Sequence, residues 1–224
     1  MIPWKLLDQV SFPGGGALRL YNRGEEFSIN LDASILMNSS LHASEDGLAS
    51  IACARFRGKP KPAILIGGLG MGYTLAEALK RVGPGARLVV AEIVPAVVKW
   101  NRGPLSHLAG HPLKDRRVTV LEQDVAETIR AGREVYSAIL LDVDNSPEGL
   151  TREVNNWLYS PAGLEAAFSA LQPRGVLGVW SARPDRKFVK RLKKAGFRVE
   201  EIAARARNKH RGGHHIIWMA ERPG

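Results

Sequence analysis

One stretch, Ala63 to Leu79, constrains the fold more than any other part of the chain. It opens with the apolar run AILI, which has the length and branching of a strand buried on both faces. Four glycines follow within six positions, and leucine and alanine then recur at helical spacing. Glycine permits positive φ and lets the backbone approach a ligand closely, and a helix N-terminus offers unpaired N–H groups. The order strand, glycine turn, helix predicts the first unit of a nucleotide-binding α/β fold.

A second apolar run, Leu88 to Ala91, ends in Glu92, twenty residues after Gly72. In folds of this kind, an acidic residue at about this position accepts hydrogen bonds from ribose hydroxyls. The glycine pattern is Gly68-x-Gly70-x-Gly72, whereas the dinucleotide fingerprint has its third glycine one position later. The sequence therefore predicts an adenosine site and favours an S-adenosylmethionine-type cofactor over NAD.

Strands and helices are expected to alternate along the rest of the chain. Apolar runs predict strands at 117–122, 137–141 and 176–180, and a terminal strand pair at 197–203 and 214–220. This alternation predicts a parallel sheet with right-handed crossovers, in which ligands bind beyond the carboxyl ends of the strands. Acidic side chains follow three of these ends, namely Glu92, Asp124, and Asp142 with Asp144. Each of them alone can be a helix cap, but together they favour a ligand site at this edge.

The first forty residues differ from this α/β pattern. Alternating segments at 17–21, 26–31 and 34–38 predict a small antiparallel β domain over residues 1–40. The run Ser44 to Asp46 has N-cap chemistry and predicts a helix over about 45–55, before a linker at 57–62. Residues 41–224 are then expected to form a second, Rossmann-like domain.

Composition narrows the class of protein. The chain has 224 residues, 45% of them apolar, which is enough for one substantial core. Its single cysteine, Cys53, excludes a disulfide framework or a cysteine metal cluster, so we expect no metal and a buried thiol on a helix. No apolar run approaches membrane-spanning length, and charged residues interrupt the N-terminal MIPWKLLDQV. We expect a cytoplasmic protein with no membrane partner.

Positive charge is concentrated near the C-terminus. The net charge is +10, and residues 183–211 carry twelve lysines or arginines against three carboxylates. Such a segment either contacts nucleic acid or another polyanion, or is a solvated helix face followed by a basic loop. No aromatic platform is interleaved with these charges, which weakens the nucleic-acid interpretation.

These motifs together resemble the spermidine synthase-like family, a branch of the class I S-adenosylmethionine-dependent methyltransferase superfamily. The resemblance covers most of the chain: the N-terminal β segment, the turn IGGLGMG, Glu92 within VVAEIVPAVVKWNRG, QDV after the third strand of the α/β part, LDVDNSP after the fourth, and the terminal strand pair. It implies a Rossmann-like doubly wound sheet of the class I methyltransferase type with a small N-terminal β appendage.

The resemblance also implies roles for individual residues. The glycine turn would bind the cofactor, Glu92 would hold the ribose diol, and Asp124 would hold the adenine amino group. Asp142 would lie beside the cofactor, where the family keeps the carboxylate that serves its amine nucleophile, and Asp144 is a second catalytic candidate. The implied residues are Gly68, Gly70, Gly72, Glu92, Asp124 and Asp142 for the cofactor, with Asp142 and Asp144 for catalysis.

The chain departs from the family at positions that recognise polyamines. The glycine turn of aminopropyltransferases usually reads GGGDGG, but here Leu69 replaces a glycine and Met71 replaces the aspartate. The family's DE...YHE segment corresponds to residues 41–46, where Glu45 can match the last glutamate and the tyrosine is missing.

Three functions therefore stay open. The first is a transferase that uses S-adenosylmethionine or its decarboxylated form to pass a methyl or aminopropyl group to a small amine acceptor, with a homodimer as one option. The second is a nucleic-acid methyltransferase that uses residues 183–211. The third is a non-catalytic relative that binds an adenosine ligand.

Overall fold

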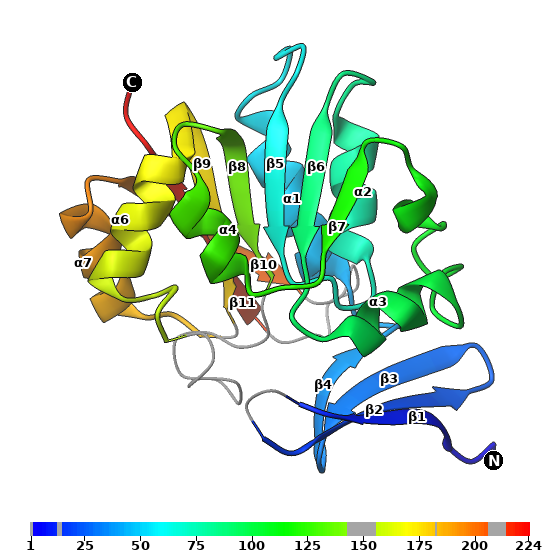
Figure 1. Ribbon diagram of the computed structural model, residues 1–224. Coiled ribbons are helices and arrows are strands. Elements are labelled where there is room, and N and C mark those ends of the chain that lie inside the picture. Colours follow the sequence, from blue (N-terminus) through cyan, green and yellow to red (C-terminus); the bar gives the residue numbers. More distant parts are fainter. Residues whose placement is uncertain (1, 13–14, 143–155, 182, 206–213) are drawn as a thin grey trace.

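The computed structural model describes the whole chain except residues 1, 13–14, 143–155, 182 and 206–213 (Figure 1). It contains two sheets, one of four strands near the N-terminus and one of seven strands that carries helices on both faces. This arrangement confirms the predicted Rossmann-like α/β fold with a separate N-terminal β appendage. The division at residue 40 into two domains stays a prediction, because side chains of both sheets belong to one apolar cluster.

The N-terminal sheet is a meander in which each strand pairs antiparallel with the next. Its strands are β1 (Lys5–Ser11), β2 (Ala17–Arg23), β3 (Glu26–Leu31) and β4 (Ser34–Asn38). The sequence analysis missed β1, because Leu6 and Leu7 are adjacent, both are exposed, and a bulge interrupts the pairing between Leu6 and Asp8. Burial alternates only from Leu7 to Ser11, and its half-buried positions are Asp8 and Val10, so the sequence shows no period-two alternation of apolar residues.

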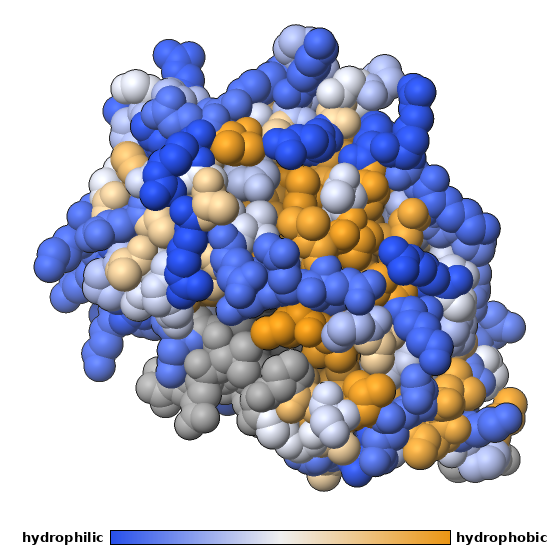
Figure 2. Space-filling view, in the orientation of Figure 1, coloured by the Kyte–Doolittle hydropathy of each residue, from blue (hydrophilic) through white to orange (hydrophobic). Residues whose placement is uncertain are grey.

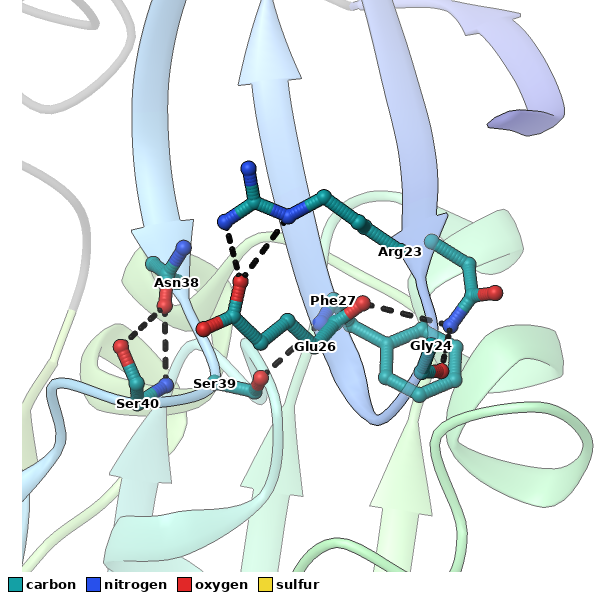
Figure 3. A network of polar contacts seen from close by, with 8 residues as sticks. Arg23, Gly24, Glu26, Phe27, Asn38, Ser39 and Ser40 are labelled. Carbon is teal, nitrogen blue, oxygen red and sulfur yellow. Dashed lines mark hydrogen bonds and ion pairs between the residues drawn. The ribbon is translucent and has the colours of Figure 1, made fainter. Parts of the chain in front are cut away.

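Short polar contacts fix the turn between β2 and β3 against the end of β4 (Figure 3). The Arg23 guanidinium donates to Glu26 Oε2 from both Nε and Nη2. The backbone N–H of Phe27 donates to Ser39 Oγ over 2.9 Å, and Ser40 donates to Asn38 Oδ1. The residues that follow β4 are thus held beside β3.

The larger sheet has the strand order β10-β11-β9-β8-β5-β6-β7, with β5 to β9 parallel and β11 antiparallel to both of its neighbours. The terminal hairpin predicted from the sequence is confirmed. The strands of the larger sheet are β5 (Ala63–Gly67), β6 (Arg87–Ala91), β7 (Val118–Leu121), β8 (Tyr136–Leu141), β9 (Leu171–Ser181), β10 (Arg198–Arg205) and β11 (His214–Glu221). Because the strand order reverses beside β5, the topological switch point lies there, which is where open α/β sheets bind ligands.

Helices pack on both faces of this sheet, with α1 and α2 on one face and α4, α6 and α7 on the other (Figure 1). The bounds are α1 (Ala43–Ala54), α2 (Tyr73–Arg81), α3 (Pro95–Arg102), α4 (Val125–Ala131), α6 (Pro161–Ala170) and α7 (Arg186–Lys194), with a 3-10 turn η1 (Pro112–Lys114). Cys53 is buried on α1, as expected, and burial raises the pKa of its thiol to about 12.

Two element boundaries differ from the prediction. Helix α1 begins two residues earlier than expected, with His42 at the N-cap and no capping side-chain bond; the His42 ring instead contacts Asp46 at 2.8 Å. Strand β9 begins at Leu171, five residues before the predicted start at residue 176, and within this added part Arg174 has φ of 60° and the register with β8 is irregular. Within the part of the chain that the structure describes, no helix is long and apolar enough to cross a membrane.

Candidate functional site

The glycine turn leaves β5 at its carboxyl end and enters α2. Gly68, Gly70 and Gly72 have φ of 86°, 51° and 85°, values that L side chains rarely adopt. The turn is closed by a bond from the Gly72 N–H to the Leu69 carbonyl, at 2.8 Å. Glycine is therefore required by backbone geometry at all three predicted positions, and Gly72 is also the N-cap of α2.

Three of the predicted site residues follow adjacent strands at the same register. In the ladders, Gly67 of β5 is opposite Ala91 of β6 and Leu141 of β8. The next residue on each strand is Gly68, Glu92 or Asp142. Since parallel strands end at one edge of the sheet, the turn and the two carboxylates lie side by side there, with β5 in the middle.

Glu92 is 6% exposed, and its carboxylate binds the backbone of the glycine turn. Oε2 accepts from the Leu69 N–H at 2.8 Å, and Oε1 accepts from the Val94 N–H at 2.8 Å. Burial raises the pKa of Glu92, while backbone N–H groups oppose that shift. The backbone N–H groups of Gly70 and Ile93 also act on this carboxylate, so it faces four backbone donors of the turn and of the segment after β6. The predicted contact of Glu92 with a ribose diol stays a prediction.

Asp142 accepts a hydrogen bond of 2.5 Å from the Thr74 hydroxyl, which belongs to the first turn of α2. Its backbone N–H donates to the Gly67 carbonyl and so continues the β5–β8 ladder. Burial raises the pKa of the Asp142 carboxyl from 3.8 to about 6, and the bond from Thr74 lowers it in part. Near neutral pH this side chain is a carboxylate whose basicity is above that of an ordinary aspartate, which suits a group that accepts a proton.

The raised pKa of Asp142 predicts a pH-dependent stability. A carboxyl whose folded pKa exceeds its unfolded pKa stabilises the fold at low pH, and that contribution is lost as the pH rises through about 6. Asp142→Asn cannot ionise and keeps an acceptor for Thr74. At about pH 7.5, we expect the variant to exceed the wild type by about 1–3 kcal/mol in free energy of unfolding, with little difference near pH 4. Urea titrations of both proteins at the two pH values test this, and an equal difference at both would contradict it.

The other two predicted acidic residues have different positions. Asp124 is the N-cap of α4, where Oδ1 accepts from the Ala126 N–H at 2.8 Å. This is the helix-cap role that the sequence analysis kept as an alternative, and the adenine contact stays a prediction. Asp144 lies outside the described residues. In the described part of the chain, no group of three or more His, Cys, Asp or Glu side chains is arranged to hold a metal ion.

Three neighbours of the site were not singled out from the sequence. Thr74 holds Asp142, and Asn101 on α3 donates from Nδ2 to the Gly70 carbonyl at 2.8 Å. Met37 of β4 covers the turn so closely that a Cβ on Gly70 would lie 2.6 Å from its sulfur. Met71, where the resemblance implied an aspartate, is 1% exposed and packs in the core.

A cavity of about 570 Å³ lies between the N-terminal sheet and α2. Its lining includes Glu25, Glu26, Asp46, Tyr73 and Lys80. The rings of His42 and Tyr73 stack with centroids 4.1 Å apart, and the Tyr73 hydroxyl donates to the Ser39 carbonyl. Glu92, Asp124 and Asp142 are not among its lining residues, so it is separate from the strand-end site.

Comparisons with known proteins find similarity in structure and not in sequence. No protein-family model matches the chain, and no curated protein matches it. Among solved structures, spermidine synthase from Thermotoga maritima is 18% identical, with a TM-score of 0.78 over 97% of this chain and 73% of that one. A spermidine synthase in complex with the transition state analogue AdoDATO is 18% identical, with a TM-score of 0.77 over 97% of this chain and 72% of that one.

A methyltransferase structure also matches, over a smaller part of the chain. Precorrin-6y C5,15-methyltransferase from Geobacter metallireducens GS-15 is 17% identical, with a TM-score of 0.53 over 77% of this chain and 87% of that one. The match to the spermidine synthases extends over nearly the whole chain, and the match to the methyltransferase covers about three quarters of it. The protein has a spermidine synthase-like fold.

Proposed function

We propose that this protein is a transferase that binds S-adenosylmethionine or its decarboxylated form and passes an alkyl group to an amine acceptor. The observation that carries the proposal is the adjacency of the glycine turn, Glu92 and Asp142 at the switch point of the sheet. The fold shared with a spermidine synthase that was solved with AdoDATO supports the cofactor class.

The bound cofactor supplies an electrophilic carbon on its sulfonium. Glu92 accepts hydrogen bonds from the ribose hydroxyls and fixes the adenosine against the turn. Asp142 attracts the acceptor's ammonium group and takes its proton, because an amine with a pKa of about 10 is mostly protonated near pH 7. Thr74 donates to Asp142 Oδ2 and orients the carboxylate. The held amine lone pair can then align behind the transferred carbon.

The residues of the turn predict which form of the cofactor binds. With Met71 in place of an aspartate and packed in the core, this position supplies no carboxylate for the amine end of a decarboxylated cofactor. We expect intact S-adenosylmethionine to bind at least as tightly as the decarboxylated form. Calorimetric titrations with both cofactors and their thioether products test this. A preference of more than about tenfold, or 1.4 kcal/mol, for the decarboxylated form would contradict it and would favour aminopropyl transfer.

A further inference from the structure

We propose that the exposed face of α7 is a docking surface for the phosphate backbone of a nucleic-acid duplex. This inference is independent of the proposed transferase activity. The surface, called here the α7 basic face, comprises the exposed cations of α7 and one on each side of the helix, namely Arg186, Lys187, Lys190, Lys193 and Lys194 with Arg183 before the helix and Arg198 at the start of β10. In the described part of the chain, none of these seven cations lies within ion-pair distance of a carboxylate.

The carboxylates of this segment are engaged in other contacts. Asp185 Oδ1 caps α7 by accepting from the N–H groups of Lys187 and Phe188. Glu200 pairs with Arg55 of the segment after α1, and Glu201 accepts from Trp218 Nε1 at 3.0 Å. Only Arg191, which lies 3.7 Å from Asp185, has an acidic neighbour on the helix itself. The positive charge of the face is therefore not neutralised locally, and it can attract a polyanion.

The spacing of the lysines suits a strand of phosphates. Lys187, Lys190 and Lys194 are three and seven residues apart, so they form one row along the helix. At 1.5 Å per residue the row is about 10 Å long. Each strand of a duplex carries one phosphate per about 3.4 Å of axis, so the row spans about three phosphate steps of one strand when the helix lies along the axis.

The apolar side of α7 explains why a duplex is favoured over a single strand. Phe188 and Leu192 are fully buried against the sheet, and Phe188 packs edge-on against Trp218. Among the described residues of this face, no aromatic ring is exposed on which an unpaired base could stack. Hydrophilic side chains predominate where α7 lies, at the left of Figure 2. Phosphate contacts without base stacking are typical of sequence-independent duplex binding.

The α7 basic face begins near the strand-end site of Glu92 and Asp142. Strand β9 ends at Ser181, two residues beyond Val179, and Val179 is opposite Leu141 of β8. Arg183 and the first turn of α7 therefore begin at the sheet edge that holds Asp142. A duplex on the α7 basic face would lie beside this edge.

Binding of a labelled duplex of mixed sequence, measured by anisotropy between about 50 and 200 mM salt, tests the proposal. The test variant is Lys187→Gln, Lys190→Gln, Lys194→Gln, and the control is Lys61→Gln, Lys99→Gln, Lys114→Gln, which removes three exposed lysines elsewhere. Glutamine has a helix propensity close to that of lysine, so α7 should persist, and circular dichroism checks this.

We expect the wild type to lose affinity steeply with salt. The slope of log K against log salt should become shallower by about 2–3 in the test variant, since each phosphate contact contributes about 0.9. Affinity at low salt should fall at least about tenfold in the test variant and stay within about twofold in the control. Equal weakening of both variants would overturn the proposal, because net charge alone would then explain binding. The proposal would also be overturned if the protein bound single strands more tightly than the duplex. Tighter binding to anionic phosphatidylserine vesicles than to the duplex would overturn it too.

Discussion

Asp142→Asn is expected to lower turnover by about 10²- to 10⁴-fold while the fold and cofactor affinity persist. The amide has nearly the same shape and can still accept from Thr74, but it cannot take a proton from an acceptor ammonium. The rate should be measured on small linear diamines, with each form of the cofactor. A thermal melt and a cofactor titration on the same preparation separate a chemical defect from a structural one.

Two further variants make this test specific. Thr74→Val removes the hydrogen bond that lowers the pKa of Asp142, so the rise of rate with pH should move to a higher pH. Asp185→Asn makes the same exchange at the N-cap of α7 and should leave the rate unchanged. A normal rate for Asp142→Asn would remove this residue from the mechanism. A lowered melting temperature with poor cofactor binding would give it a structural role.

Glu92→Ala is expected to weaken cofactor binding by about tenfold to a hundredfold or slightly more, since losing a charged hydrogen-bond partner costs roughly 1.5–3 kcal/mol. The ribose hydroxyls would lose their acceptor. The Leu69 and Val94 N–H groups would also lose theirs, which loosens the turn. Glu92→Gln keeps one carbonyl acceptor and should show a smaller loss.

The control for Glu92 is another buried glutamate. Glu77 on α2 is 6% exposed and pairs with Arg81, but it does not lie at the strand ends. Glu77→Ala should lower the melting temperature without changing calorimetric affinity in the folded fraction. If folded Glu92→Ala binds the cofactor as tightly as the wild type does, the ribose assignment is wrong.

The parts of the fold that the sequence predicted well are those whose local pattern is unambiguous. The strands β5, β6 and β8 are continuous apolar runs, and all of their residues except Arg87 are buried. The turn at Gly68, Gly70 and Gly72 could be predicted because glycine is the residue that readily adopts positive φ, and all three have positive φ in the structure. Strand β1 could not be predicted, because its two leucines are exposed and one of its two half-buried positions is Asp8, so no apolar alternation marks the strand.

Contacts between distant segments could not be predicted. Thr74 and Asp142 are 68 residues apart, and nothing in either segment indicates that the start of α2 meets the end of β8. Met37 and Gly70 meet only because the N-terminal sheet packs over the turn. The candidate carboxylates were found because acidic residues after apolar runs form a local pattern, whereas the residues that position them belong to other elements.

The N-terminal sheet packs on the glycine turn, and this packing couples the local unfolding of the sheet to that of the turn. Leu20 and Ile29 belong to the same apolar cluster as Leu69 and Met71, and Met37 rests on Gly70. The sheet therefore cannot unfold locally without exposing the backbone that would hold a ligand. The N-terminal sheet and the glycine turn therefore form one cooperative unit. A ligand bound at the turn raises the free energy of local unfolding of the whole unit.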